Sequence, residues 1–395
     1  MIRARGYSPD DLPLLRPTVA IIDATAITDN VERLRAHVAP SMCCAVVKAD
    51  GYGHGAVTSA RAAIRGGATW LAVALVEEGI ELRQAGISTP ILVLSEFPSG
   101  AAPLVVQHRL TPTVYSTERI DAVASAAAAV GQRCRVHLKV DTGMRRVGCA
   151  PAEAVALARA IAASPSLQLG GTFTHFAVSD EAENGFTAQQ TARFLDVVAN
   201  LRAAGVDPGV VHASNSGGGI VHNSATPSPS LDMVRFGIAI YGHTPDSSVI
   251  TSTYGVDLQE ALTLRSEVSH VKVVSKGEAV SYGHTWRAPS DRVIATVPIG
   301  YADGVPRRLG GAEADVLIGG RRCRIVGRVT MDQILIDAGP IETSVARGDD
   351  VILIGRQGDE SITAWEWATK CSTLAYEITC GISKRVPRIV LGAAS

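Results

Sequence analysis

Short apolar segments alternate with longer alanine-rich amphipathic segments from about residue 40 to residue 242, and this alternation constrains the fold more than any other feature. The apolar segments predicted to be strands are Cys43–Ala49, Trp70–Ala74, Ile91–Leu94, Thr111–Tyr115, Arg135–Asp141, Thr172–His175, Val210–Ala213 and Met233–Ile240. The segments predicted to be helices are Ile27–Ala39, before the first strand, and Ala56–Arg65, Val76–Ala85, Thr117–Val130, Ala152–Ala163 and Thr187–Ala204. Eight strands that are each followed by a helix or a turn predict an α/β fold with an N-terminal (β/α)8 barrel. A doubly wound open sheet is the alternative, and SGGGIVHNSATPSPS before the last strand predicts at most a short turn.

The pattern changes after about residue 255. Alternating or apolar stretches bounded by Gly- and Asp-containing turns predict strands, and Thr363–Ala375 is the only predicted helix. Thr18–Asp23, near the N-terminus, is also strand-like. We therefore predict a barrel domain over residues 1–255 and a C-terminal mostly-β domain over residues 256–395, with residues 1–25 a candidate for packing on the second domain.

Composition and charge exclude several classes of protein. Hydrophobic residues make up 46% of the chain and the formal net charge is −1, without a basic stripe, which argues against a nucleic-acid partner. The seven cysteines include no C-x-x-C pair, so reduced thiols are expected, and no metal site. The N-terminal residues lack the apolar core of a signal peptide, and no apolar run is long enough to span a membrane. We predict a cytoplasmic protein.

Reactive side chains fall where the predicted barrel strands end, which is where barrel enzymes place their active sites. Lys48 ends the first strand, and a lysine amine in a desolvated place loses its proton more easily and can form a Schiff base. The other such residues are Lys139, Asp141 and Arg146 around the fifth strand, His175 on the sixth, Ser214, Asn215 and Ser216 after the seventh, and Arg235 on the eighth. Each alone has an ordinary structural interpretation, such as a core histidine or a flexible turn. Their convergence on one end of a barrel predicts an active site.

The string AVVKADGYGHG, residues 45–55, resembles the pyridoxal 5′-phosphate attachment motif of alanine racemases. The resemblance extends from PTVAIIDA to KRVPR and includes VSYGHTW, PIGYADGVPR, GRVTMDQ and AYEITCGISKRVPR in the second domain. It implies an isomerase that interconverts L- and D-alanine by a two-base mechanism and supplies D-alanine for peptidoglycan. It also implies a homodimer with composite active sites.

The resemblance assigns roles position by position. Lys48 is implied to hold the cofactor as an internal aldimine and to act as one catalytic base, and Tyr282, donated by a partner subunit, as the other. The remaining cofactor-binding residues are implied to be Tyr52, His175, Asn215, Ser216, Arg235, Gly237, Ile238 and Tyr376, with His212 supporting them. The substrate-binding or substrate-access residues are implied to be Arg146, Tyr301, Met331 and Asp332, and Lys139 is a candidate for carbamylation.

Other functions stay open at this point. A broader racemase acting on serine or other small amino acids is closely related, and a non-catalytic pyridoxal phosphate-binding protein or a barrel-containing decarboxylase would use the same cofactor. Two positions depart from the family pattern: Arg145 stands where glycine is common, and Thr330 where cysteine is frequent. The sequence does not fix substrate breadth, rates, the carbamylation of Lys139 or a specialised role such as inhibitor resistance.

Overall fold

The computed structural model describes residues 16–222, 231–249 and 251–392. The N-terminal residues 1–15 and residues 223–230 of the predicted short turn lie outside the described part. The chain divides into two compact units. We call them the barrel unit, Ala26–Gly51 and Ala56–Gln259, and the β unit, the described residues within Met1–Thr25, Tyr52–Gly55 and Glu260–Ser395. None of the described helices is long and apolar enough to cross a membrane.

Eight parallel strands form the barrel unit in the order β8-β7-β6-β5-β4-β3-β2-β9. Their bounds are β2 Met42–Val46, β3 Trp70–Val73, β4 Ile91–Val93, β5 Thr111–Val114, β6 Cys134–Lys139, β7 Leu167–Phe173, β8 Val210–His212 and β9 Met233–Phe236. Most positions of these strands are buried on both faces, which explains why the sequence shows continuous apolar runs rather than alternation. The predicted barrel is confirmed.

The last gap in the ring, between β8 and β9, closes through three hydrogen bonds. The Asp232 amide donates to the carbonyl oxygen of Val211 at 2.7 Å, and the Val211 amide donates to the Asp232 carboxylate at 2.7 Å. Further along, the Arg235 amide donates to the carbonyl oxygen of Ser214 at 3.1 Å. A side chain thus replaces one backbone acceptor, and the barrel is nearly closed.

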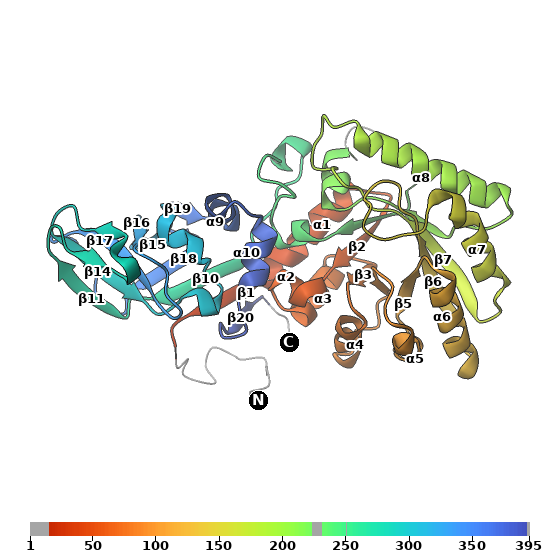
Figure 1. Ribbon diagram of the computed structural model, residues 1–395, viewed down its shortest axis with the longest axis horizontal. Helices are drawn as coiled ribbons and strands as arrows, with labels where there is room; N and C mark the ends of the chain where they lie inside the picture. The colour runs from red at the N-terminus through yellow and green to blue at the C-terminus, as the bar shows by residue number, and fades with distance from the viewer. Residues whose placement is uncertain (1–15, 223–230, 250, 393–395) are drawn as a thin grey trace. The chain divides into compact units, whose positions relative to one another are not determined.

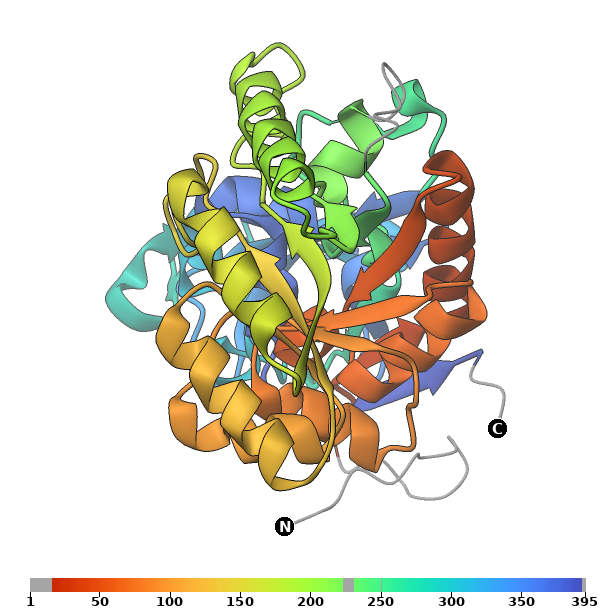
Figure 2. The same cartoon turned by 90° about the vertical axis from the view of Figure 1, so that its right-hand side faces the viewer.

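Helices surround these strands (Figures 1 and 2). Their bounds are α1 Ala24–His37, α3 Ala56–Arg65, α4 Val76–Gln84, α5 Ala102–Gln107, α6 Thr117–Ala129, α7 Ala154–Ala163 and α8 Phe186–Ala203. Small side chains allow close packing, since α3 buries Ala56, Ala60, Ala62 and Ala63. The Ser116 hydroxyl caps α6 by accepting a hydrogen bond from the Arg119 amide at 3.2 Å. Sequence analysis placed six of these helices within three residues at each end and did not name α5.

The β unit contains a ten-stranded, largely antiparallel sheet. Its strands are β1 Val19–Asp23, β10 Leu262–Glu267, β11 His270–Val274, β14 Arg292–Val297, β15 Asp315–Ile318, β16 Arg321–Val326, β17 Ile334–Pro340, β18 Asp350–Gln357, β19 Glu360–Ile362 and β20 Arg388–Leu391. β10 alternates buried and half-buried positions, as expected for a sheet with one covered face. β1 pairs with β10 and β20, so the strand predicted near the N-terminus belongs to this sheet.

The helical content of the β unit was underestimated. Sequence analysis expected one helix, Thr363–Ala375, whereas the structure has α9 Ala364–Cys371 and α10 Ala375–Gly381. The first helix ends because Ser372 adopts a left-handed conformation with φ 54°. A separate hairpin of β12 Ala279–Val280 and β13 Trp286–Arg287 lies outside the large sheet.

Candidate functional site

A left-handed turn directly follows Lys48. β2 ends at Val46, three residues before the predicted strand end, and α2 (Lys48–Tyr52) begins at the lysine. Ala49, Asp50 and Gly51 have φ of 53°, 52° and 61°, so the backbone cannot continue the strand. The Gly51 amide closes the turn on the carbonyl oxygen of Val47 at 3.0 Å. The prediction that Lys48 ends a strand was therefore wrong by two residues.

Lys139, the last residue of β6, lies in a cationic environment. Its side chain is buried, and its ammonium lies 5.3 Å from the ring centre of Phe173. Burial, together with the positive charges of Arg235, Arg146 and Lys48, lowers the pKa of Lys139 from 10.5 to about 7, against the opposing effect of Asp141. These cations therefore lie within electrostatic reach of one another.

Arg235 on β9 is 2% exposed and organises the polar groups of the barrel interior. Its Nη1 donates to Nδ1 of His212 at 2.6 Å, and its Nη2 donates to Nδ1 of His175 at 3.2 Å. Nη2 also donates to the carbonyl oxygens of Thr174 and Ala213. Burial lowers the pKa of Arg235 to about 10, which leaves the guanidinium charged at neutral pH. Among the described residues, none accepts a hydrogen bond from its Nε at bonding distance.

A second histidine extends this network into the core. Nε2 of His212 lies 3.0 Å from Nδ1 of His137, and the His212 ring stacks on Phe173 at 4.6 Å between centres. Burial, assisted by Arg235, lowers the pKa of His212 and His175 well below 6.5, and burial lowers that of His137 to about 3. All three rings are therefore neutral at physiological pH.

The loops after β8 and β9 meet through Ser216. The Gly237 amide donates to the Ser216 hydroxyl at 3.0 Å, so the hydroxyl proton is directed elsewhere. The Asn215 side-chain oxygen accepts from the Ser179 hydroxyl at 2.6 Å and from the Gly218 amide at 3.0 Å, which fixes the loop. Ile238 begins the short 3₁₀ turn Ile238–Tyr241, and the first amides of such a turn have no partner within it.

The loop that carries Arg146 is held by Asp141. The Asp141 carboxylate accepts hydrogen bonds from the amides of Gly143 at 2.9 Å and Arg145 at 3.0 Å. Arg145 adopts φ 59°, in the left-handed region that glycine favours. An arginine in place of glycine at this position therefore carries a conformational cost. Arg146 itself is exposed.

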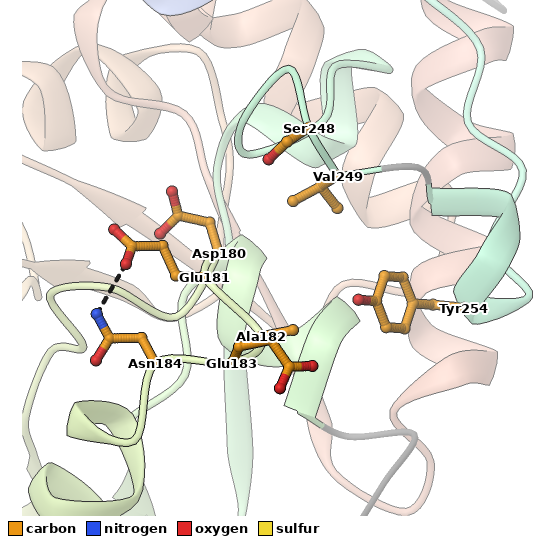
Figure 3. A pocket seen from close by; sticks show the side chains of 8 residues that line it. All are labelled: Asp180, Glu181, Ala182, Glu183, Asn184, Ser248, Val249 and Tyr254. Carbon is orange, nitrogen blue, oxygen red and sulfur yellow. Dashed lines mark hydrogen bonds between the residues drawn. The ribbon is translucent and has the colours of Figure 1, made fainter.

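A separate hollow of about 500 Å³ lies between the segments that follow β7 and β9 in the barrel unit (Figure 3). Its lining includes the carboxylates of Asp180, Glu181 and Glu183. Three carboxylates repel an anion, so this hollow is unsuited to a phosphate group.

Within the β unit, Tyr52 and Tyr376 lie side by side, with ring centres 6.1 Å apart. The segment Tyr52–Gly55 packs on α10, and a Cβ at Gly53 would overlap the carbonyl oxygen of Thr379. The Arg388 side chain donates to the carbonyl oxygen of Gly53 at 3.2 Å. Two tyrosines that the sequence separates by 324 positions (376 − 52) are thus brought together.

Tyr282 lies on the short hairpin formed by β12 and β13, also in the β unit. Its side chain is 73% exposed. The Ser281 hydroxyl donates to the carbonyl oxygen of Arg328 at 2.7 Å and anchors the turn. In the single chain, the Tyr282 phenol is therefore exposed to solvent.

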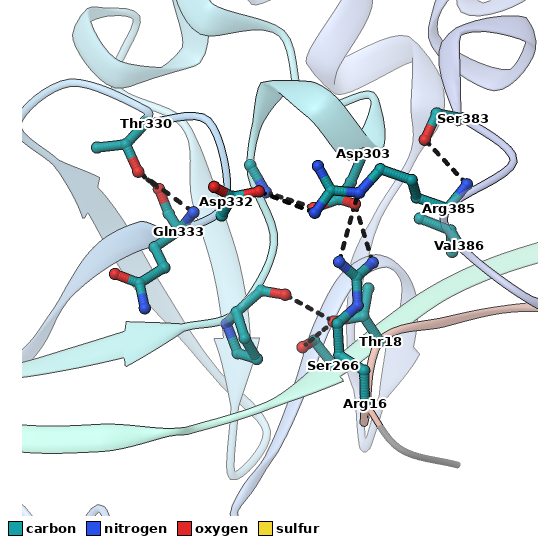
Figure 4. Close-up of polar contacts among 12 residues, drawn as sticks. Arg16, Thr18, Ser266, Asp303, Thr330, Asp332, Gln333, Ser383, Arg385 and Val386 are labelled. Carbon is teal, nitrogen blue, oxygen red and sulfur yellow. Dashed lines mark hydrogen bonds and ion pairs between the residues drawn. The ribbon is translucent and has the colours of Figure 1, made fainter.

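Tyr301, Met331 and Asp332 belong to two adjoining loops of the β unit. The amide of Tyr301 donates to the carbonyl oxygen of Thr330, and that of Ala302 to the carbonyl oxygen of Met331, both at 3.0 Å. Asp332 pairs with Arg385 at 2.8 Å, and Arg385 and Arg16 both contact Asp303 (Figure 4). This ion-pair network fixes the loops that present Tyr301 and Met331.

Sequence reasoning missed two polar residues of the barrel unit. His137 lies two positions before Lys139 on β6, and strand alternation could have placed both on one face. Glu78 hydrogen bonds to the backbone beside Lys48, a contact that no local pattern predicts.

Comparisons with known proteins cover nearly the whole chain. Residues 22–245 match the family model for the alanine racemase N-terminal domain, and residues 261–390 the model for the C-terminal domain. The chain is 46% identical to the alanine racemase of Symbiobacterium thermophilum, over 97% of this chain and 99% of that protein. The crystal structure of alanine racemase from D-cycloserine-producing Streptomyces lavendulae is 38% identical, with a TM-score of 0.90, over 97% of this chain and 99% of that one. The histidine racemase of Leuconostoc mesenteroides is 30% identical, with a TM-score of 0.84, over 96% of this chain and 99% of that one.

Proposed function

This chain belongs to the alanine racemase family, and on that premise we propose that it interconverts L- and D-alanine using pyridoxal 5′-phosphate. The observation that carries the proposal is the grouping of Lys48, Lys139, His175 and Arg235 at the carboxyl ends of the barrel strands. The charges of Lys48 and Arg235 lower the pKa of both Lys139 and His175. The product D-alanine would serve peptidoglycan synthesis in the cytoplasm.

The donor set of the barrel unit suits the cofactor's polar groups. Its carbonyl requires an amine, which Lys48 supplies. Its phosphate requires hydrogen-bond donors, which the Ser216 hydroxyl and the amide of Ile238 supply, with Gly237 and Asn215 in the same loops. The assignment of Tyr52 and Tyr376, which belong to the β unit, to this phosphate is part of the proposal. Its ring nitrogen requires a donor that stays protonated, and the Nε of Arg235 suits this need. When bound, the cofactor supplies an electron-withdrawing ring that acidifies the Cα–H bond of an attached amino acid.

Racemisation needs a proton carrier on each face of that carbon. We assign the Lys48 amine to one face and the Tyr282 phenol to the other. The exposure of the Tyr282 phenol in the single chain supports its donation to a second subunit, in a homodimer with composite sites. Proton transfer by each positioned group is worth about 10²–10⁴-fold in rate.

The substrate's carboxylate requires a cation, and we assign Arg146 to it. A neutral Lys139 amine can react with carbon dioxide, and the resulting carbamate would place a negative charge beside Arg146 and Arg235. Tyr301, Met331 and Asp332 are assigned to substrate access. The division into domains 1–255 and 256–395 also stays a prediction.

A second candidate function is the racemisation of a larger amino acid. The similarity to a histidine racemase favours keeping this candidate, because the same fold accommodates a larger side chain in that protein. A non-catalytic pyridoxal phosphate-binding role, or a serine racemase, would also retain Lys48.

The experiment that separates these functions follows exchange at Cα. The purified protein is incubated with Cα-deuterated L- or D-alanine, serine or histidine, and deuterium loss is measured together with formation of the opposite enantiomer. We expect both signals to be largest for alanine in both directions. Cofactor absorbance without exchange would indicate a binding protein.

A further inference from the structure

The turn that presents Lys48 is strained. Residues Ala49, Asp50, Gly51 and Tyr52 all have φ between 52° and 61°, and only one of them is glycine. Each L-residue in this conformation costs about 1–2 kcal/mol, so such a turn persists only where its surroundings hold it.

The carboxylate of Glu78 is one of those supports. Its Oε1 accepts a hydrogen bond from the Ala49 amide at 2.7 Å, and its Oε2 accepts from the amides of Ala74 at 2.8 Å and Leu75 at 3.0 Å. Glu78 stands in the first turn of α4, so its bond to Leu75 is ordinary helix capping. The bond to Ala49 serves a different segment of the chain.

The position of that bond relative to Lys48 matters. On one side of the lysine, the peptide joining Val47 to Lys48 accepts a hydrogen bond from the Gly51 amide at its Val47 carbonyl oxygen, at 3.0 Å. On the other side, the peptide joining Lys48 to Ala49 donates its N–H to Glu78. The two peptides that fix the direction of the Lys48 Cα–Cβ bond are therefore held by the Gly51 amide, within the turn, and by Glu78.

We propose that Glu78 is a positioning residue for Lys48: one carboxylate oxygen caps α4, and the other holds the left-handed turn that aims the lysine amine. The inference rests on the proposed function, in which Lys48 carries the cofactor. Without the bond to Glu78, the peptide after Lys48 is restrained only by the rest of the turn, and the amine spends less time in the orientation that reacts with a carbonyl.

Glu78→Gln separates the two roles. Glutamine has the same length but only one acceptor oxygen, which can keep the two amides of Ala74 and Leu75. Its NH₂ group then faces the Ala49 amide, a donor facing a donor, so the turn loses its bond while α4 stays capped. Glu77→Gln is the matched control, because Glu77 is exposed, lies in the same helical turn and undergoes the same change of charge.

Three quantities are measured on the full-length apoprotein: the melting temperature, the hydrogen-exchange rate of the Ala49 amide, and the rate at which added pyridoxal phosphate becomes covalently attached, followed by absorbance. For Glu78→Gln relative to Glu77→Gln, we expect an unchanged melting temperature, faster exchange at Ala49, and attachment slowed on the order of ten- to hundredfold.

Attachment at the control rate, whether or not the Ala49 amide exchanges faster, would overturn the proposal and leave Glu78 as a helix cap. Slower attachment with an unchanged exchange rate at Ala49 would equally contradict it. Failure of the unmutated protein to attach pyridoxal phosphate at all would instead refute the proposed function. In that case, the hydrogen-exchange rate of the Ala49 amide still shows whether Glu78 holds the turn.

Discussion

Arg235 donates a hydrogen bond of 2.6 Å to Nδ1 of His212, and this contact determines the protonation of two buried rings. Arginine can only donate, so Nδ1 of His212 accepts and its proton resides on Nε2. That Nε2 in turn donates to Nδ1 of His137 at 3.0 Å. The hydrogen bonds run in one direction, from the guanidinium into the core, and the network holds Arg235 as a fixed cation.

A fixed cation beside the cofactor's ring nitrogen should suppress side reactions. Arg235 cannot hand over its proton at neutral pH, so a ring nitrogen facing it would stay unprotonated and the ring would withdraw electrons less strongly. We expect Arg235→Glu to lower racemisation and to raise the fraction of turnovers that end as pyruvate and aminated cofactor. The exposed Arg159→Glu, on α7, is the control for the change of charge. An unchanged fraction of aminated cofactor in Arg235→Glu counts against this role.

Removing the His212 ring should destabilise the barrel unit. His212→Ala leaves Arg235 Nη1 and His137 Nδ1 without their shared partner and removes the ring stacked on Phe173. Each unsatisfied buried group costs about 1–3 kcal/mol, so we expect a loss of roughly 2–5 kcal/mol in the free energy of unfolding. Urea unfolding measures it, with the exposed His270→Ala as control. Equal stability of the two variants would contradict the network.

The depressed pKa of Lys139 predicts a pH-dependent stability. Its folded-state pKa is about 7 and its unfolded value 10.5, so the unfolded chain binds more protons between these limits. Stability must therefore rise as the pH rises from 7 toward 10.5, and the full cost of the buried charge is present below pH 7. We expect Lys139→Met to be more stable than the unmutated protein at pH 6, and this advantage to shrink at pH 9. Urea unfolding in carbonate-free buffer tests it, and a difference that stays constant with pH would refute it.

The loops bearing Tyr301 and Met331 should not tolerate a side chain at Gly300. A Cβ there would overlap the carbonyl oxygens of Thr330 and Met331. Overpacking of this kind typically costs about 1–3 kcal/mol, so Gly300→Ala should lower the melting temperature and raise KM for alanine. Gly311→Ala meets no atom within 4 Å and serves as the control. Equal melting temperatures and equal KM values for the two variants would contradict the close contact between Gly300 and the loop of Thr330 and Met331.

A composite site predicts complementation between inactive variants. Lys48→Ala and Tyr282→Phe should each lose at least about 10²-fold in rate, because each lacks one proton carrier. If Tyr282 serves the partner subunit, unfolding and refolding an equimolar mixture should restore activity, since each mixed dimer contains one intact site. Activity that stays at the level of the separate variants would argue against shared sites.

The barrel could be predicted from the sequence because its strands are buried on both faces and therefore appear as separate apolar runs. The candidate catalytic side chains of the barrel could be proposed from the sequence because parallel strands end at the same side of the barrel. The end of β2 could not be predicted, since Ala49 and Asp50 ordinarily avoid the left-handed conformation that they adopt there.

One other error of the sequence analysis also comes from a left-handed residue that is not glycine. Ser372 ends α9 in a left-handed conformation without the glycine that usually signals a helix end, so the predicted helix ran on to Ala375, and α10, which begins there, was not predicted. Glu78 was missed for a different reason. In the sequence it is an ordinary first-turn glutamate, and its hydrogen bond to the Ala49 amide depends on which loop lies beside α4 in three dimensions. Contacts between segments distant in sequence are what single-sequence patterns do not contain.

Borohydride reduction of the purified protein loaded with pyridoxal phosphate, followed by peptide mapping, tests the central claim most directly. We predict one stable cofactor adduct, on Lys48, and complete loss of racemisation after reduction. An adduct on a different lysine, or full activity after reduction, would contradict the assignment on which the proposed function depends.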